Sequence, residues 1–191
     1  MESAVRRFRR DGYHPVRIED VAEDAAVSVG TVYNYYSTKG DLLMATVTLE
    51  VEEVLAAGEA ILADPPAGAE AALRRLIWQY YDHSLEYLTK EMWRAAMAIS
   101  IEAPHTPNGR RYAELDARLA DQVARLVARL QARGEVRPDL DPRPLGEILF
   151  HMLNALFVAF VRDDAMTIEA LKAAADDGLC AMAALMTPAG G

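Results

Sequence analysis

Apolar residues recur at spacings of three and four along almost the whole chain after Gly12, and no stretch shows the sustained alternation typical of strands. This periodicity predicts an all-α protein. Turn-forming residues interrupt the pattern and divide the chain into about nine helices, short ones first and longer ones later. The expected breaks lie at residues 12–17, 26–28, 37–38, 64–68, 103–109, 134–144 and 163–167.

Composition places the chain among ordinary globular proteins, with 52% hydrophobic and 26% charged residues. The most apolar run, residues 148–161, is interrupted by His151 and Asn154 and is shorter than the ~20 residues that a membrane span needs. No apolar stretch of the secretory type follows the N-terminal arginines, and a single cysteine, Cys180, excludes an internal disulfide. We therefore expect a cytoplasmic protein without a membrane partner.

The net charge of −9 is unfavourable for a nucleic-acid partner, but the charge is unevenly distributed. Residues 1–17 hold five arginines against Glu2 and Asp11, whereas the chain beyond residue 40 is acidic. Any DNA contact is therefore expected to depend on a few residues near the N-terminus.

Residues 18–36 place a small residue in one short helix, a tight turn after it, and an apolar anchor in the next helix, which is typical of a helix-turn-helix. Ala22 leaves room for the crossing helix, and Ser28 provides the hydroxyl that an N-cap needs. The next helix is expected to start at Thr38, with Asp41 completing a capping box, and to run for about 25 residues, or about 37 Å.

The N-terminal 45 or so residues resemble the TetR family of regulators. The residues that carry the resemblance are Phe8, Gly12, Tyr13, Val21, Ala22, Val27, Ser28, Gly30, Thr31, Val32, Tyr33, Tyr35, Tyr36, Lys39 and Leu42. The resemblance implies a helix-turn-helix DNA-binding domain over residues 1–40 and a helical ligand-binding and dimerisation domain over residues 41–191.

The sequence departs from the family pattern at three points. Ala26 stands where the turn usually has glycine, and a left-handed conformation costs a residue with a side chain ~1–2 kcal/mol. Arg17 replaces the usual hydroxyl residue at the N-cap of the second helix. This replacement removes about 1 kcal/mol of stabilisation from that helix, but it offers a contact to a DNA phosphate. The basic arm that often precedes the first helix in the family is not part of this sequence.

A recognition helix over residues 29–36 is expected to enter the major groove with its first residues nearest the base edges. Val29 and Thr31 are the expected base readers, and Tyr33, Tyr35 and Lys39 are the expected phosphate contacts. The full predicted set is Arg17, Ser28, Val29, Gly30, Thr31, Tyr33, Asn34, Tyr35 and Lys39.

Two alternatives remain open for this segment. Tyr36 is expected to pack under the DNA-binding helices rather than contact DNA. The run of Arg6, Arg7, Arg9 and Arg10 either contacts DNA or only solvates the first helix.

The helix expected over residues 145–161 is apolar around nearly its whole circumference, so it is expected to contact its own core on one side and a partner copy on the other. Together with the last helix, which is rich in small residues, it predicts a two-fold four-helix interface and a homodimer. The predicted interface residues are Leu149, Leu153, Phe157, Phe160, Leu171, Gly178 and Met182. A fully internal helix in a monomer is the alternative.

Residues 73–101 are rich in aromatic residues and methionine, which line both ligand pockets and ordinary cores. The predicted pocket residues are Trp78, Tyr80, Tyr81, Trp93, Met97, Phe150 and His151.

The sequence holds no convergent nucleophile, base and orienting group, and His14, His83, His105 and His151 lack a metal-ligand spacing. We therefore expect no enzyme activity, no metal and no cofactor. The predicted function is a repressor that binds a pseudo-palindromic operator in double-stranded DNA and is released by a small apolar or aromatic effector. The alternative is a helical ligand-binding or interaction protein that has lost specific DNA binding.

Overall fold

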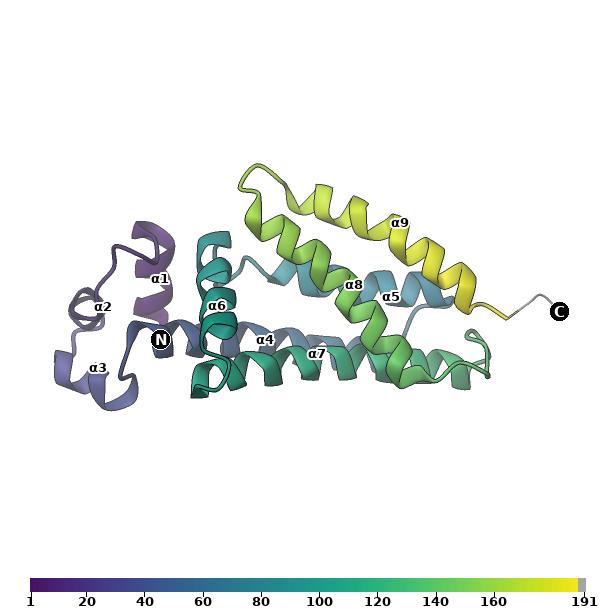
Figure 1. Ribbon diagram of the computed structural model, residues 1–191, viewed down its shortest axis with the longest axis horizontal. Helices are drawn as coiled ribbons and strands as arrows, with labels where there is room; N and C mark the ends of the chain where they lie inside the picture. The colour runs from purple at the N-terminus through teal and green to yellow at the C-terminus, as the bar shows by residue number, and fades with distance from the viewer. Residues whose placement is uncertain (189–191) are drawn as a thin grey trace. The chain divides into compact units, whose positions relative to one another are not determined.

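The computed structural model describes residues 1–188, and all regular secondary structure in this part of the chain is α-helical (Figure 1). The helices are α1 (Glu2–Asp11), α2 (Ile18–Asp24), α3 (Val29–Tyr35), α4 (Lys39–Ala63), α5 (Ala69–His83), α6 (Lys90–Glu102), α7 (Pro107–Ala132), α8 (Pro142–Arg162) and α9 (Ile168–Met186). The expected all-α class and the nine helices over these residues are confirmed.

The break between α5 and α6, residues 84–89, is absent from the seven expected breaks. This segment contains no glycine or proline, the two residues that most strongly indicate the end of a helix, so the sequence pattern did not predict a break here. The local signal is Thr89, whose hydroxyl accepts the N–H of Met92 at 3.3 Å and begins α6 as an N-cap.

The chain forms two compact units, each containing segments that are distant in sequence. The N-terminal unit comprises Met1–Glu52 and Ser84–Leu115, and the C-terminal unit comprises Glu53–His83 and the chain from Asp116 onward. Helices α4 and α7 each contribute one part to either unit. The expected domain boundary after residue 40 stays a prediction.

The core of the N-terminal unit is shared between α1, α4 and the α6 region. Phe8, Leu43, Leu88 and Met92 are fully buried, although two of them lie more than 40 residues from the others along the chain. Glu50 is also buried, and its Oε2 accepts the N–H of Tyr87 at 3.3 Å. The three short helices α1–α3 therefore belong to a larger core that includes α6.

The C-terminal unit depends on close helix crossings. A Cβ at Gly146 of α8 would lie 2.3 Å from Cα of Ala124 in α7, so only glycine allows this approach of the two backbones. The phenol of Tyr81 donates to the carbonyl of Leu153 at 2.9 Å, and its ring stacks on Phe157 with centroids 6.2 Å apart. These contacts join α5 to α8.

Helix α8 is longer than the apolar run that was expected. Its 21 residues are long and apolar enough, by length and composition alone, to cross a membrane, so the length argument made from the sequence is wrong. A core helix of a soluble protein meets the same criteria, and 44% of its most apolar window is buried inside this structure.

Candidate nucleic-acid interface

Helices α2 and α3 form a helix-turn-helix around a small core of their own. Ile18, Ala22 and Val32 make this core, and Val29 and Tyr36 pack against it. The predicted packing of Tyr36 is confirmed. Val29, by contrast, is only half-exposed, because part of its side chain is used in the core rather than being free for a base edge.

The turn between α2 and α3 has the geometry expected from the sequence. Ala26 has φ 53°, a left-handed conformation that its side chain disfavours. The N–H of the next residue, Val27, donates to the carbonyl of Ala22 at 3.1 Å. Ser28 caps α3, since its Oγ accepts the N–H of Thr31 at 3.1 Å. The predicted cap and the predicted strain at Ala26 are both confirmed.

The solvent face of α3 is polar and aromatic. Tyr33 is 45% exposed and Tyr35 is 79% exposed, far above what large aromatic side chains usually show. Thr31 and Asn34 are exposed as well, and a Cβ at Gly30 would be in ordinary contact with Oγ of Ser28, at 3.8 Å. The helix carries no acidic residue, so no negative charge on α3 itself would oppose an approaching phosphate.

Lys39 makes intramolecular contacts, and its predicted phosphate contact stays a prediction. Its Nζ donates to the carbonyls of Tyr13 at 3.0 Å and His14 at 2.8 Å and lies 4.6 Å from the centroid of the Tyr13 ring. Burial lowers the pKa of Lys39, and the charge of Glu91 opposes this effect. The ammonium is therefore used inside the protein, because a backbone carbonyl attracts it as a phosphate oxygen would.

Arg17 and the N-terminal arginine run also have intramolecular partners. Arg17 is largely exposed and pairs with Glu19 at 3.3 Å. Arg7 contacts carboxylates of α1 and α2, including Asp24 at 3.2 Å. Arg9 donates to the carbonyls of Leu85 at 2.6 Å and of Glu86. Of the four arginines in the run, these two mainly hold α1 against its neighbours.

The first 46 residues match the family model described as "Bacterial regulatory proteins, tetR family". A curated relative, the HTH-type transcriptional repressor KstR of Rhodococcus jostii, is 32% identical over 91 residues, which are 46% of this chain and 41% of that protein. The match thus spans less than half of the relative's length.

Solved structures show the same fold over nearly the whole chain. A TetR-family regulator from Mesorhizobium loti aligns with TM-score 0.76 and 20% identity, covering 98% of this chain and 94% of that chain. The regulator FadR of Bacillus subtilis, solved with stearoyl-CoA, aligns with TM-score 0.68 and 19% identity, covering 93% and 94%. The N-terminal segment thus resembles TetR-family regulators, and the chain shares the fold of solved structures from that family.

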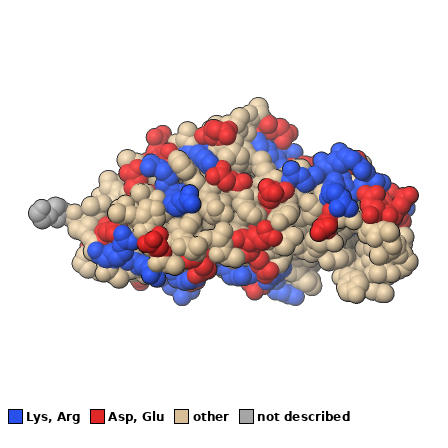
Figure 2. All heavy atoms as spheres, turned by 180° about the vertical axis from the view of Figure 1, so that it is seen from behind, with Lys and Arg blue, Asp and Glu red and all other residues tan. Residues whose placement is uncertain are grey.

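Basic side chains gather in one region of the surface and are intermixed with acidic ones elsewhere. On the face drawn in Figure 2, lysine and arginine atoms form a cluster toward the right-hand end, next to a group of acidic atoms. Arg6, Arg9 and Arg10 line one open hollow together with Asp24. Residues 1–40 hold six basic and six acidic residues. Contacts to DNA must therefore come from particular side chains at short range.

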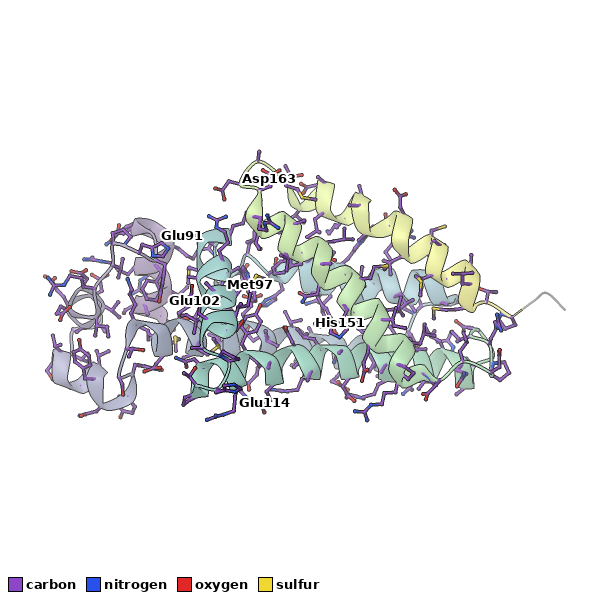
Figure 3. All side chains as sticks on the ribbon, viewed as in Figure 1. Glu91, Met97, Glu102, Glu114, His151 and Asp163 are labelled. Atoms are coloured by element: carbon purple, nitrogen blue, oxygen red, sulfur yellow. The ribbon has the colours of Figure 1, made fainter. Side chains whose placement is uncertain are left out.

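The predicted pocket residues fall in both units. Trp93 and Met97 lie on α6 in the N-terminal unit, where the indole N–H of Trp93 donates to the carbonyl of Ser84 at 2.7 Å. His151 lies on α8 with its side chain exposed (Figure 3). The remaining four are Trp78, Tyr80, Tyr81 and Phe150 in the C-terminal unit.

Those four aromatic residues have distinct surroundings. Trp78 is half-buried beside the cations of Arg74 and Lys172, which lie 5.7 and 5.1 Å from its ring centroid. The phenol of Tyr80 donates to Oε1 of Gln122 at 2.7 Å, and burial raises its pKa well above the ordinary value. Tyr81 and Phe150 are buried.

The predicted interface residues of α8 and α9 must be revised. Leu149, Leu153, Phe157, Phe160 and Leu171 are at most 9% exposed because they pack inside the C-terminal unit of the same chain. The outer face carries other residues, and Gly178 and Met182 of the predicted set are half-exposed beside it. The exposed or half-exposed apolar residues of these helices include Ile148, Met152, Ala155 and Ala159 on α8 and Ala174, Gly178, Ala181, Met182 and Leu185 on α9.

Two carboxylates that the sequence analysis missed stand out in the structure. Asp116 in α7 is largely buried, and this burial raises the pKa of its carboxyl to about 6. Glu91 at the start of α6 accepts the backbone N–H groups of Tyr13 and His14 (Figure 3). Among the described residues, no group of three or more His, Cys, Asp or Glu side chains could hold a metal ion.

Asp116 predicts a pH-dependent stability. A folded-state pKa of about 6, above the ordinary 3.8, means that the folded state binds the proton more tightly. The free energy of unfolding should therefore fall as pH rises from about 4 through 6. Asp116→Asn should remove the cost of burying a charged carboxylate in the folded state. In urea titrations it should therefore raise the free energy of unfolding at pH 7.5 by about 2 kcal/mol and change it little at pH 4.

The matched control is Asp121→Asn, an exposed aspartate in the same helix, which should change stability by less than about 0.5 kcal/mol at either pH. An equal effect of Asp116→Asn at pH 4 and pH 7.5 would contradict the assignment of the raised pKa.

Proposed function

We propose that this chain is a TetR-family repressor that binds a pseudo-palindromic operator in double-stranded DNA as a homodimer and leaves it when a small apolar or aromatic effector binds. In this proposal residues 1–40 are the DNA-binding domain, residues 41–191 bind the effector and the second copy, and the protein acts in the cytoplasm. The observation that carries the proposal is the exposed, acid-free face of the capped helix α3.

The exposed residues of α3 match the chemistry of a major groove. The methyl and hydroxyl groups of Thr31 suit a thymine methyl or a polar base edge, and the amide of Asn34 can pair with adenine. Tyr33 and Tyr35 present phenol groups that donate to phosphate oxygens and set the position of the helix. This division leaves Thr31 and Asn34 as the base readers, with Val29 contributing its exposed part.

Repression is favoured by the curated relative, which is named a transcriptional repressor and shares 32% identity over 91 residues with this chain. A protein bound across an operator blocks access to that DNA without needing a contact to any other protein. This is the simplest action for a chain whose DNA contacts are few and local.

A second copy of the chain is the proposed occupant of the outer face of α8 and α9. Ile148 is 58% exposed and Leu185 is 68% exposed, whereas Gly178 and the alanines between them allow close helix approach. Two copies also supply the two recognition helices, about 34 to 36 Å apart, that successive major grooves require.

An apolar effector is supported by the C-terminal unit and by relatives. Tyr80, Tyr81 and Phe150 provide aromatic surface, and Asp116 is a perturbed polar group of the kind that marks binding sites. Two solved structures with this fold are described as complexes with stearoyl-CoA and lauroyl-CoA, both of which carry a long apolar chain.

The alternative, a helical ligand-binding or interaction protein without specific DNA binding, is favoured by two observations. The turn at Ala26 is strained, and the charges of residues 1–40 balance. DNA selection separates the two functions.

Selection from randomised duplexes should enrich a palindrome with half-sites one helical turn apart. Thr31→Ala should relax preference at one base pair per half-site and weaken operator binding about tenfold, since a good base contact is worth ~1–3 kcal/mol. Tyr35→Phe should weaken binding to all sequences without changing the salt dependence, because the lost hydroxyl carries no charge. Gel shifts measure both effects.

The control is Thr187→Ala, which removes a hydroxyl just beyond the end of α9. If the wild-type protein enriches no sequence, the repressor proposal fails and the alternative stands.

Light scattering at micromolar concentration should give about 42 kDa, twice the 21.0 kDa chain. Ile148→Glu should give the monomer mass, because a charge placed in an apolar interface is costly to bury. Ile101→Glu is the matched control, since Ile101 is 78% exposed on α6 and the variant should stay dimeric. A monomeric wild type, or an Ile148→Glu dimer of unchanged stability, would contradict the proposed interface.

Calorimetry with lauroyl-CoA as the probe tests release by an effector. Its affinity should fall by about 5- to 150-fold when the protein is saturated with operator, because coupling between two ligands is reciprocal. Equal affinity in both titrations would contradict release, and no binding in either would exclude long acyl chains as the effector class.

A further inference from the structure

The turn between α1 and α2, residues 12–14, is bound on both sides by charged side chains that are distant in sequence. Oε1 of Glu91 accepts the N–H groups of Tyr13 at 3.1 Å and His14 at 3.2 Å. Nζ of Lys39 donates to the carbonyls of the same two residues. The anion thus meets the backbone donors and the cation meets the backbone acceptors, so both charges favour one conformation of the turn.

The turn has little freedom to adopt another conformation. Gly12 has φ +85°, and a Cβ there would lie 3.2 Å from Oε2 of Glu91. Tyr13 is 7% exposed, with its ring edge-on to Phe8 at a centroid distance of 5.3 Å. Any displacement of Glu91 would therefore have to move the turn or break its hydrogen bonds.

Both flanks of α6 make further contacts with the DNA-binding part of the N-terminal unit. Before α6, Arg9 of α1 donates to the carbonyls of Leu85 and Glu86. After α6, in the first turn of α7, Nδ2 of Asn108 donates to Oδ1 of Asp41 at 2.7 Å. The other oxygen of Asp41 accepts the N–H of Thr38 at 2.8 Å, which is part of the capping box that begins α4 directly after α3.

These contacts surround the helix-turn-helix in sequence. The turn at residues 12–14 precedes α2, and the cap at Thr38 and Asp41 follows α3. Since both ends of the α2–α3 segment are bound to α6 or its flanks, a movement of α6 would be transmitted to both ends. Residues 84–89 join α6 directly to α5, which belongs to the C-terminal unit.

We propose that Glu91 is a positioning residue for DNA binding. It fixes the turn at residues 12–14 and thereby the orientation of α2 and α3 relative to α6. The inference rests on the proposed DNA-binding function and adds a side chain outside the DNA-binding helices on which that function depends.

The test compares Glu91→Ala and Glu91→Gln with the wild-type chain by amide hydrogen exchange and by binding to the selected operator. In Glu91→Ala, exchange should accelerate at residues 13–14 and also across residues 18–35, while residues 142–162 stay unchanged. Operator affinity should fall at least tenfold. Glu91→Gln should be intermediate, because its amide oxygen accepts the same N–H groups without the charge that faces Lys39.

Glu102→Gln is the matched control, an exposed glutamate at the other end of α6, and it should leave exchange and affinity unchanged (Figure 3). Faster exchange confined to residues 13–14 with wild-type operator affinity would overturn the proposal, because Glu91 would then be only a local cap. Failure of the wild-type chain to select an operator would instead contradict the proposed function itself. If Glu91→Ala does not fold, the intermediate affinity expected for Glu91→Gln decides.

Discussion

The two helices of the helix-turn-helix, α2 and α3, bury too little apolar surface between them to hold their own arrangement. Their shared core consists of Ile18, Ala22 and Val32, with two half-buried neighbours. A cluster of this size cannot offset the conformational entropy of the ordered residues from Ile18 to Tyr35. The position of the recognition helix therefore depends on contacts made outside the helix-turn-helix. Those contacts are the burial of Phe8 against a wider core and the charged groups around the turn at residues 12–14.

Local sequence signals predicted local structure well. Ser28, Thr38 and Asp41 cap helices as expected, and Ala26 adopts the left-handed conformation that its place in the turn requires. Each of these features depends on residues within four positions of one another. Glu91 could not be found in the same way, because its partners lie 77 and 78 residues away and are backbone groups, which leave no trace in residue type.

The type of a residue did not predict its partner where one side chain can bind two different groups. An ammonium at Lys39 fits a phosphate oxygen or a carbonyl oxygen equally well, and the structure has the carbonyls of Tyr13 and His14 in place. The apolar residues of α8 pose the same problem, since a helix that is apolar on every side does not reveal which side is internal. Tyr81, stacked on Phe157 and bonded to the carbonyl of Leu153, identifies the inner face.

A regulator must hold its recognition helix in place with contacts that an effector can still break, so individually weak contacts serve this purpose better than strong ones. A hydrogen bond to a charged group contributes about 1.5 to 3 kcal/mol, and allosteric coupling between two ligands is typically about 1 to 3 kcal/mol. Breaking one of the two hydrogen bonds of Glu91 would thus cost about as much as an effector must supply. A larger buried apolar contact at the same place would resist an effector of ordinary affinity. Holding the recognition helix through a few charged hydrogen bonds therefore keeps the DNA-binding arrangement stable and still reversible.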